Sequence, residues 1–526
     1  MAETTQDRPA SASAPPRPGR AGVWEYLIPI LLCAVALVRV YRSPYSASNL
    51  DFTPDAQEYV IAAQRLVLLG SYSIEIEGVA YPPRYPPWFS VLVLAPFYAM
   101  APDNLGIGII PILLFSLVAV MAAYAIGRRV SGVWGGALAG WLLLLDSDFS
   151  FHARLILTET VVVALLMLLT LVYLRLREGA ALRWYWVAGV VAALAGAMRV
   201  LAFASAVPLL LHVLLSRRQV TWRLLAVAAP SLLVMIATGI YNHQTFGHWR
   251  RSGYNFWTAV PYDYFALTFS LQYLDENLRQ LSQLWLPLLL GPVGAVALWW
   301  ARRARARDLL TMLSLGVLPI TLVHLFYFFV QSRFHLPMLA LLCVIGGCGI
   351  ALLVPDKLRL HVWLLAVVMA ATAWPGKILL PQLSGLPLKR LVAQQMASKE
   401  PDAVIITALD PVYCEPLALR GTQRRVIPIS REVEYASKAV AWKKVEDPVP
   451  PPRSPFDHRA RGLLRGGAKD VVAFTADEAP HHIVELHRQG VPIYLDLTFV
   501  DPRDPSAQLM IHLFQMLNRP VGLLEQ

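Results

Sequence analysis

Apolar runs of about bilayer-spanning length recur along most of the chain, separated by short polar segments. Such a run predicts a transmembrane helix, because a helix pairs its own backbone polar groups within the hydrocarbon. We expect helices at 23–41, 104–126, 132–146, 155–174, 184–198, 200–215, 222–241, 281–301, 308–330, 335–354 and 360–380. The pattern predicts a polytopic α-helical membrane protein with about 11 transmembrane helices.

Basic side chains between the runs indicate the orientation. With these spans in place the clusters fall on one side: Arg17, Arg20, Arg128, Arg129, Arg175, Arg177, Arg183, Arg217, Arg218, Arg223, Arg302 to Arg307, Lys357 and Arg359. Basic residues are retained in cytoplasmic loops, so this side should be the cytoplasm. Residues 1–22, rich in Pro, Ala and Ser, are expected to form a disordered cytoplasmic tail.

Charge also decides two ambiguous segments. If Pro87 to Pro102 crossed the membrane, Arg128 and Arg129 would lie outside, so we interpret it as a juxtamembrane or re-entrant helix. The stretch from Trp184 to Leu215 is short for two crossings, yet a single crossing would export the arginines that follow it. We therefore expect a tight hairpin there, with Arg199 at its outer turn.

The first outer loop, 42–103, interrupts the apolar pattern with acids and an arginine. Asp55 opens a helix expected from about Asp55 to Leu69, whose apolar spacing suits the membrane surface. A carboxylate there is also a good helix cap. Arg84 stands among prolines and aromatics, a setting that suits a phosphate group. Charge beside hydrocarbon is costly, so this loop is the first candidate for an active site.

Two further candidate clusters lie at the outer ends of later runs. Glu159 falls one turn inside an apolar run, where a carboxylate needs a partner, and His152 and Arg154 precede it. Arg199 and Arg333 suit the phosphate of a lipid substrate, although either side chain can instead reach lipid headgroups without a specific role.

A long outer loop runs from Asn242 to about Gln280. It carries Tyr254 and Trp257, which we expect either to cover a substrate cleft or to belong to a solvated loop. Together with the clusters above, this loop means that nearly all the reactive polar residues near the membrane are expected on the outer face.

The C-terminal region, 381–526, has a different pattern. Short runs rich in β-branched residues predict buried strands at 403–408, 425–430, 470–474 and 492–497. Helical stretches near 431–444 and 480–489 alternate with them, which predicts a small extracytoplasmic α/β domain with a mostly parallel sheet. It contains no glycine-rich phosphate loop, which argues against a nucleotide site.

Composition supports a membrane protein and narrows its chemistry. Hydrophobic residues make up 56% of the chain and charged residues 15%, with a net charge of +11. The positive charge does not indicate nucleic-acid binding, because it is confined to the clusters between apolar runs. The four cysteines show neither a disulfide framework nor metal-thiolate spacing.

Several motifs, in order, resemble the glycosyltransferase C superfamily (GT-C), in particular the protein O-mannosyltransferase and lipid A aminoarabinose transferase group. They are TPDAQEYVIAAQRLVLLGSYS with RYPPW, RLILTETVVVALLMLLTLVYLRLR, AMRVLAF, YNHQTFGHWRRSGYNFW and FYFFVQSRFHLPML. The resemblance covers most of 23–380. It implies a bacterial inner-membrane enzyme that transfers a hexose or pentose from a polyprenyl-phosphate donor to an acceptor in the cell envelope, with inversion.

The resemblance also implies residue roles. Asp55 would be the general base, and Glu159 would be a second acid that positions the site or a divalent metal. The residues implied for the donor and its lipid phosphate are Arg84, Arg333, Arg199 and Tyr59; those for the substrate cleft are His152, Arg154, Tyr254 and Trp257. No metal ligands are assigned, and the active site would face the periplasm or exterior.

Two departures from the family pattern stand out. Many relatives place glutamate after the first-loop aspartate, where this chain has Ala56, and Arg84 is one residue further from Pro86 than the lysine of lipid A transferases. The rival hypothesis is a transporter or flippase of lipid-linked sugars, which should show inverted repeats and charges near the bilayer midplane. No clear repeat is visible, and the ionisable residues gather at one face. A family member that binds lipid-linked glycan without catalysis is a third hypothesis.

Overall fold

The computed structural model describes residues 23–41, 54–76, 79–102, 104–216, 220–257, 262, 265–372, 395–396, 398–407, 425–428, 487–496, 498, 515 and 522–523. Several expected features lie outside these residues: the tail 1–22, the end of the last expected span, the strand at 470–474 and the helix at 431–444.

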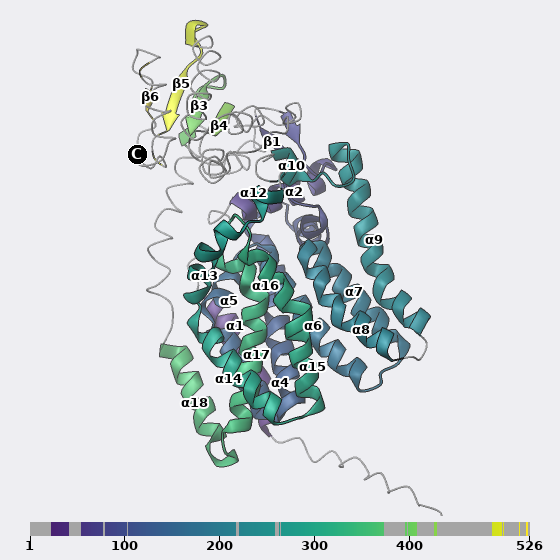
Figure 1. Cartoon of the computed structure of the whole chain (residues 1–526). Helices are drawn as coiled ribbons and strands as arrows, with labels where there is room; N and C mark the ends of the chain where they lie inside the picture. Colours follow the sequence, from purple (N-terminus) through teal and green to yellow (C-terminus); the bar gives the residue numbers. More distant parts are fainter. Residues whose placement is uncertain are drawn as a thin grey trace, which may run out of the picture.

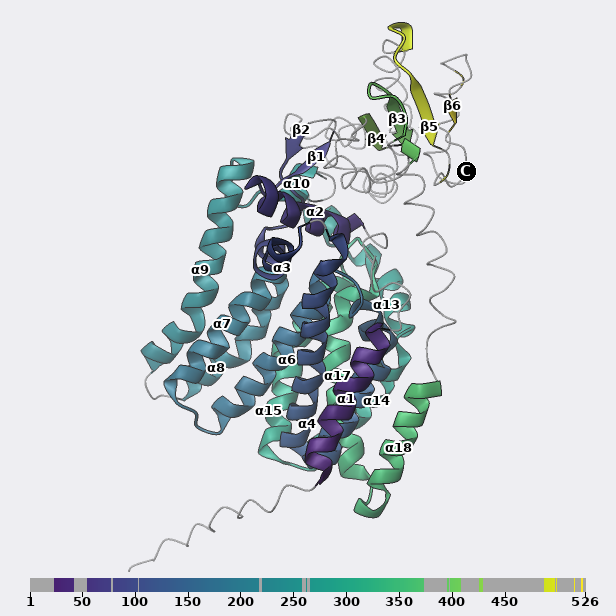
Figure 2. The same ribbon diagram turned by 180° about the vertical axis from the view of Figure 1, so that it is seen from behind.

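Long helices lie side by side in one bundle (Figures 1 and 2). Its centre is formed by α1 (Val23–Tyr41), α4 (Ile109–Leu145), α6 (Thr158–Arg177), α14 (Trp285–Trp300) and α17 (Leu336–Leu353). Glycines allow close approach: a Cβ on Gly347 would lie 2.4 Å from the backbone nitrogen of Ala139, and one on Gly294 would lie 2.3 Å from the carbonyl oxygen of Ile345. Small residues at helix contacts are typical of membrane bundles.

Helix α4 consists of two antiparallel limbs. Gly132, with φ 83° and ψ −173°, interrupts it in a conformation that favours glycine. A Cβ on Gly127 would lie 2.5 Å from the carbonyl oxygen of Gly135, whereas residues eight apart in a straight helix are separated by about 12 Å along the axis. The chain therefore reverses at Gly132, which agrees with separate spans at 104–126 and 132–146.

The hairpin expected around Arg199 is present. Helix α7 (Leu182–Met198) ends before an extended Arg199, and the 3₁₀ segment η4 (Val200–Ala206) leads into α8 (Val207–Leu215). At the far ends of the hairpin, the Tyr185 hydroxyl lies 3.2 Å from His212 Nε2. Helix α9 (Val220–Phe246) packs on α7 at the side of the bundle (Figure 1).

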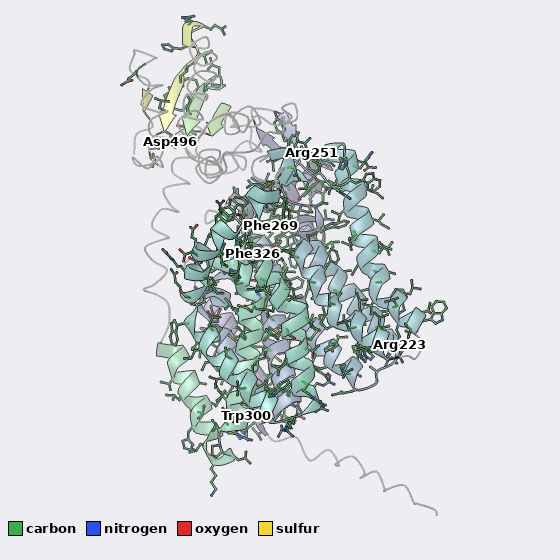
Figure 3. All side chains as sticks on the ribbon, in the orientation of Figure 1. Arg223, Arg251, Phe269, Trp300, Phe326 and Asp496 are labelled. Carbon is green, nitrogen blue, oxygen red and sulfur yellow. The ribbon has the colours of Figure 1, made fainter. Side chains whose placement is uncertain are left out.

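Basic residues from several helices meet at one end of the bundle, as the charge pattern predicted. Ion pairs join α1, α4, α6 and α15 (Ala304–Thr311) there: Arg128 to Glu25 (2.8 Å), Arg305 to Glu178 (2.7 Å) and Arg177 to Asp308 (2.8 Å). We call this the basic end. Figure 3 places Arg223 toward it and Arg251 toward the opposite end.

The first outer loop folds into a compact cap. It contains α2 (Pro54–Leu69), the antiparallel strands β1 (Ile74–Ile76) and β2 (Val79–Tyr81), the π-helical turn η2 (Ser90–Leu94) and α3 (Ala95–Met100). The segment Ser90–Met100 has 11 residues, too few to cross a bilayer of about 30 Å. It packs on α2, where the Ser90 hydroxyl donates to the Tyr59 carbonyl. Its length and its packing on α2 agree with a place for 87–102 in the first loop, which stays a prediction.

The expectation that α2 lies on the membrane surface is wrong. Every residue from 56 to 65 is buried, including polar side chains. These side chains have partners inside the protein: Gln64 donates to the carbonyl of Pro102, and Arg65 donates to Ser73. Buried polar groups are stable when hydrogen-bonded, so residues 56–65 are enclosed on all sides, whereas the end of the helix, at Leu68 and Leu69, is exposed.

The long outer loop expected from Asn242 to about Gln280, which we call the second outer loop, contains short helices: α10 (Gly253–Trp257), α12 (Phe265–Thr268), η5 (Leu271–Tyr273) and α13 (Leu274–Ser282). The pair formed by Leu271–Ser282 and α14 is bent by 87°, so the span expected at 281–301 begins only at Trp285. The other described helices are η3 (Leu105–Gly108), α5 (Ser147–His152), η6 (Met312–Val317), α16 (Leu318–Leu325), η7 (Ser332–His335) and α18 (Asp356–Thr372).

The expected span 308–330 also needs correction, because α16 ends at Leu325. Beyond it, Tyr327 forms a β-bridge with Phe269, and the Phe328 amide donates to the Thr268 carbonyl. The backbone after Leu325 therefore forms hydrogen bonds with the second outer loop instead of continuing the helix.

By length and composition, five of the described helices can cross a membrane, or six if the bent pair is one span. The folded-back α4 counts once in this number, and α1, α7 and η4 with α8 contain apolar stretches shorter than 18 residues. The protein is thus mostly helical with several membrane-spanning helices, while the count of 11 stays a prediction.

The described part of the C-terminal region contains four short strands, β3 (Val404–Thr407), β4 (Arg425–Pro428), β5 (Ile493–Asp496) and β6 (Gly522–Leu523). They pair in parallel in the order β4-β3-β5-β6, with Val404 opposite Arg425 and Ile493. Three of them match predicted runs, and β6 was not predicted. The full α/β domain stays a prediction, because the expected helices lie almost entirely outside the described residues.

Candidate active site

Asp55 lies in the first turn of α2, where the N-terminal end of a helix favours a negative charge. Its carboxylate accepts a hydrogen bond of 2.7 Å from Arg333, which lies in η7 at the start of the α17 span. The two side chains are only 16% and 11% exposed. Residues 278 positions apart in the chain therefore form one nearly buried ion pair.

Glu159 joins this pair to a second arginine. Its carboxylate lies 3.5 Å from Arg333 and accepts a bond of 2.5 Å from Arg199 at the turn of the α7–η4 hairpin. The Arg199 Nε also donates to the Thr158 hydroxyl at 3.3 Å. Arg333 thus bridges two carboxylates and brings Glu159 next to the first outer loop.

Arg84 is held by a residue that sequence reasoning did not select. Glu58 accepts hydrogen bonds from both the backbone amide and the guanidinium of Arg84, the latter at 3.3 Å. Both side chains are buried. The rigid run around Arg84 therefore docks on the same turn of α2 that carries Asp55.

Tyrosines surround the acids. The Tyr85 side chain hydrogen-bonds to Asp55, and its ring lies 4.4 Å from that of Tyr59 and 5.5 Å from that of Tyr254, between centroids. Tyr254 comes from α10, which lies directly on the first loop. A Cβ on Gly253 would be 2.4 Å from the carbonyl oxygens of both Pro83 and Arg84. The α10 part of the second outer loop therefore lies on the site, which favours the first of the two alternatives that the sequence left open, and only glycine fits this contact.

Burial raises the pKa values of the two acids of α2, and the neighbouring arginines lower them. Burial raises the pKa of Asp55, but the charges of Arg333 and Arg84 outweigh it and hold this pKa below its usual value. Burial also raises the pKa of Glu58, and Arg84 offsets it only partly, so that this pKa reaches about 7. Asp55 is therefore ionised at neutral pH, as a proton acceptor must be.

The other predicted residues lie at different distances from this cluster. His152 ends α5, with Nδ1 2.8 Å from the Asp148 carbonyl, close enough to Glu159 and Arg333 to interact with their charges. Arg154 is buried in the segment that leads to α6. The backbone of Trp257 is helical, but its side chain lies outside what the structure describes.

The site does not suit a divalent cation. Among the described residues, no three His, Cys, Asp or Glu side chains are placed to hold a metal. Asp55 and Glu159 are instead each bound by arginine, and three arginines surround them and Glu58. A cation would have to displace guanidinium groups from every carboxylate, so no metal is assigned a role.

Glu58 and Tyr85 belong to the site but were not selected from sequence. A signal for Glu58 was present, because residues three and four apart share one face of a helix. Glu58 and Tyr59 stand in that relation to Asp55. Ala56, which follows Asp55, is fully buried. Glu58, the next acid along α2, lies less than one turn beyond it.

No family model matches the chain, and no curated protein matches its sequence. Its structure is similar to that of ArnT from Cupriavidus metallidurans bound to undecaprenyl phosphate, with TM-score 0.52 and 15% identity over 76% of this chain and 89% of that one. It is also similar to the archaeal oligosaccharyltransferase AglB from Archaeoglobus fulgidus in complex with an inhibitory peptide and a dolichol-phosphate. That TM-score is 0.51, with 11% identity over 78% of this chain and 65% of that one. Both proteins are GT-C members, and the chain has the fold that its sequence resemblance predicted.

Proposed function

We propose that this protein is an inverting membrane glycosyltransferase that takes a sugar from a polyprenyl-phosphate carrier. The observation that carries the proposal is the convergence of Asp55 with Arg333, Arg199 and Glu159 from three separate parts of the chain. An ionised acid beside several guanidinium groups suits a reaction that removes a proton and releases a phosphate.

The buried Nε of Arg333 supports a phosphate-binding role. It forms no hydrogen bond among the described residues, and its contact with the Glu159 carboxylate is an ion pair at 3.5 Å. A buried N–H without a hydrogen bond is unfavourable, and a phosphate oxygen of the sugar donor would accept one from it. Arg84 and Arg199 would add positive charge on the same side. Their carboxylate partners hold these side chains in place before the lipid arrives.

The proposed reaction follows from this arrangement. Asp55 takes the proton of the acceptor hydroxyl while the hydroxyl oxygen bonds to the anomeric carbon. The bond from that carbon to the phosphate oxygen breaks, and its electron pair leaves with the lipid phosphate. Arg333, Arg199 and Arg84 stabilise the charge that develops there, where water is scarce. Attack opposite the leaving group inverts the anomeric centre. Glu159 orients Arg199 and Arg333.

The similar solved structures support the donor class. ArnT was solved with undecaprenyl phosphate and AglB with a dolichol-phosphate. We extend this to a polyprenyl-phosphate-linked hexose or pentose and to an acceptor in the cell envelope. Because basic residues are retained in the cytoplasm, the basic end would face the cytoplasm of a bacterial inner membrane. The active site and a C-terminal domain at 381–526 would face the exterior.

Purified protein tests the proposal when it is incubated with a polyprenyl-phosphate sugar and an envelope lipid extract, with products identified by mass spectrometry. We expect a new glycosylated product. We expect Asp55→Asn to slow its formation by about 10²- to 10⁴-fold, the usual contribution of a general base. The matched control is Asp275→Asn, since Asp275 is also paired with an arginine but is 74% exposed.

The thermal unfolding midpoint in detergent shows that each variant is folded. Full transfer activity in folded Asp55→Asn would contradict the role of the base. Movement of lipid-linked sugar across vesicles without a covalent product would indicate a transporter and contradict the proposed enzyme.

A further inference from the structure

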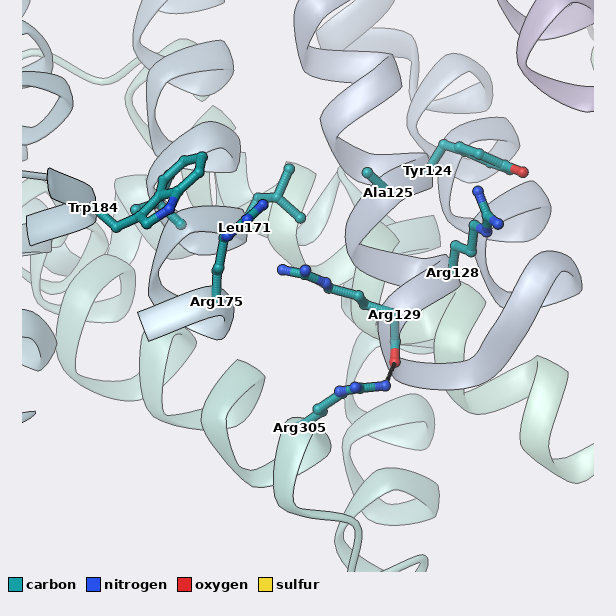
Figure 4. A pocket seen from close by; sticks show the side chains of 9 residues that line it. Tyr124, Ala125, Arg128, Arg129, Leu171, Arg175, Trp184 and Arg305 are labelled. Carbon is teal, nitrogen blue, oxygen red and sulfur yellow. Dashed lines mark hydrogen bonds between the residues drawn. The ribbon is translucent and has the colours of Figure 1, made fainter. Parts of the chain in front are cut away.

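A cavity lies at the basic end of the bundle, far from Asp55 in the fold. Its volume is 480 Å³, within the range of small-ligand sites. The walls come from the reversal of α4, the last turns of α6, the start of α7 and the start of α15 (Figure 4). Nothing in the proposed transfer reaction uses this cavity.

The polar wall of the cavity carries excess positive charge. Arg128 pairs with Glu25, and Arg129 and Arg305 share Glu178 at 3.6 Å and 2.7 Å. The fourth arginine of the wall, Arg175, has no carboxylate partner among the described residues. Two glutamates thus face four arginines. The wall can accept an anion without the loss of any existing ion pair.

The position of Arg175 favours an anion at the bilayer surface. Its guanidinium lies 4.1 Å from the Trp184 ring centroid, and the two residues flank the turn between α6 and α7. Tryptophan and arginine at the ends of membrane helices mark the interface with water. Figure 4 shows Arg129 extending from α4 toward the helix of Arg175. Guanidinium groups arranged in this way suit the oxygens of a phosphate.

The opposite wall is apolar. Leu171 and Val172 lie one turn further into the membrane on α6, and Ala125 faces them from α4. A free inorganic anion gains nothing from such a wall, whereas a phosphate ester attached to a glycerol and acyl chains fits both halves. Basic pockets between membrane helices are known to hold anionic lipid headgroups.

We propose that this cavity binds the phosphate headgroup of an anionic phospholipid from the surrounding leaflet, between Arg129, Arg175 and Arg305. The acyl chains would leave past Leu171 and Val172. The site is separate from the proposed donor site, and it would fasten the α4 reversal and the α6–α7 turn to one leaflet.

Native mass spectrometry of the full-length protein tests this when it is released from micelles containing equal amounts of phosphatidylglycerol and phosphatidylcholine. We expect the wild type to retain phosphatidylglycerol selectively. We expect Arg175→Gln, which breaks no ion pair, to weaken retention on the order of tenfold, as expected for loss of a charge-assisted contact. Ala125→Leu should weaken it by narrowing the cavity without any change of charge.

The matched control is Arg183→Gln, because Arg183 is exposed, precedes Trp184 directly and does not line the cavity. It should retain the lipid like the wild type. Equal retention in all variants, or equal retention of phosphatidylcholine, would overturn the proposal. Displacement of the lipid by sodium phosphate as effectively as by glycerol phosphate would show a site for free anions and would also overturn it.

Discussion

The two ends of the bundle use the same residue types in different surroundings. At the basic end, arginines pair with Glu25, Glu178 and Asp308 in pairs that are partly open to solvent. In the candidate active site, arginines pair with Asp55, Glu58 and Glu159 whose side chains are 16%, 1% and 2% exposed. Burial, rather than the presence of an ion pair, therefore separates charges that set the membrane topology from charges that are suited to catalysis.

Energetics follow from this contrast. Exposed ion pairs contribute about 0–1 kcal/mol, because water already solvates both partners and salt screens them. Removal of one partner from a buried pair typically costs about 3–5 kcal/mol, because the remaining charge is left without solvent. The same substitution at the two ends should therefore have very different effects.

The largest effect is expected for Arg333→Gln. It leaves Asp55 and Glu159 without their shared guanidinium, so the free energy of unfolding should fall by about 3–5 kcal/mol. Chemical denaturation in detergent measures the change, with Arg128→Gln as the control from the basic end. Equal losses in both variants would contradict the contrast between the two ends.

The next effect concerns pH. The pKa of Glu58 is about 7 in the folded protein and 4.5 in its reference state, so the folded protein binds more protons between these values. The stability contribution of this group is complete below pH 4.5 and decreases as the pH rises through 7. In the wild type, this group should lower the free energy of unfolding by at most about 3 kcal/mol as the pH rises over this range. In Glu58→Gln, this pH-dependent loss should be absent. Thermal midpoints measured from pH 4.5 to 8 test this; an unchanged slope in the variant would contradict it.

A smaller effect is expected for Gly253→Ala, because the added Cβ meets the backbone oxygens of Pro83 and Arg84. Displacing α10 from the first loop should cost about 1–3 kcal/mol, the range for overpacking. In the control Gly316→Ala, the nearest atom would lie 3.3 Å away in the Pro208 ring, so the loss should be less. Protease sensitivity of the outer loops reports the change; equal sensitivity of both variants would argue against a fixed cover.

The smallest effect is expected for Glu178→Gln at the basic end. It removes the shared partner of Arg129 and Arg305, yet the side chains are at least 30% exposed. The loss of stability should stay within about 0–1 kcal/mol and should shrink as salt is added. A large loss of unfolding free energy that does not depend on salt would contradict the contrast, because it would show that solvent is excluded from this end as it is from the candidate active site.

Much of the fold was predictable from local pattern. The loop status of 87–102 and the hairpin at Arg199 follow from apolar length and charge, because hydrocarbon penalises both unpaired backbone and exported arginines. The bounds of α2 follow from its apolar spacing and from Asp55 as a helix cap. The errors fall where tertiary contacts override pattern. Helix α16 ends early because residues after Leu325 bond to a distant loop, and α2 is enclosed because its polar side chains find internal partners.

The amino-acid pattern alone predicts the membrane class, the gathering of basic residues at one end and the candidacy of Asp55, Glu159 and Arg333. The packing of the helices was needed to show that Arg333 bridges the other two and that Glu58 holds Arg84. Span length and charge are summed along the chain, whereas an ion pair between residues 278 positions apart depends on how separate helices pack.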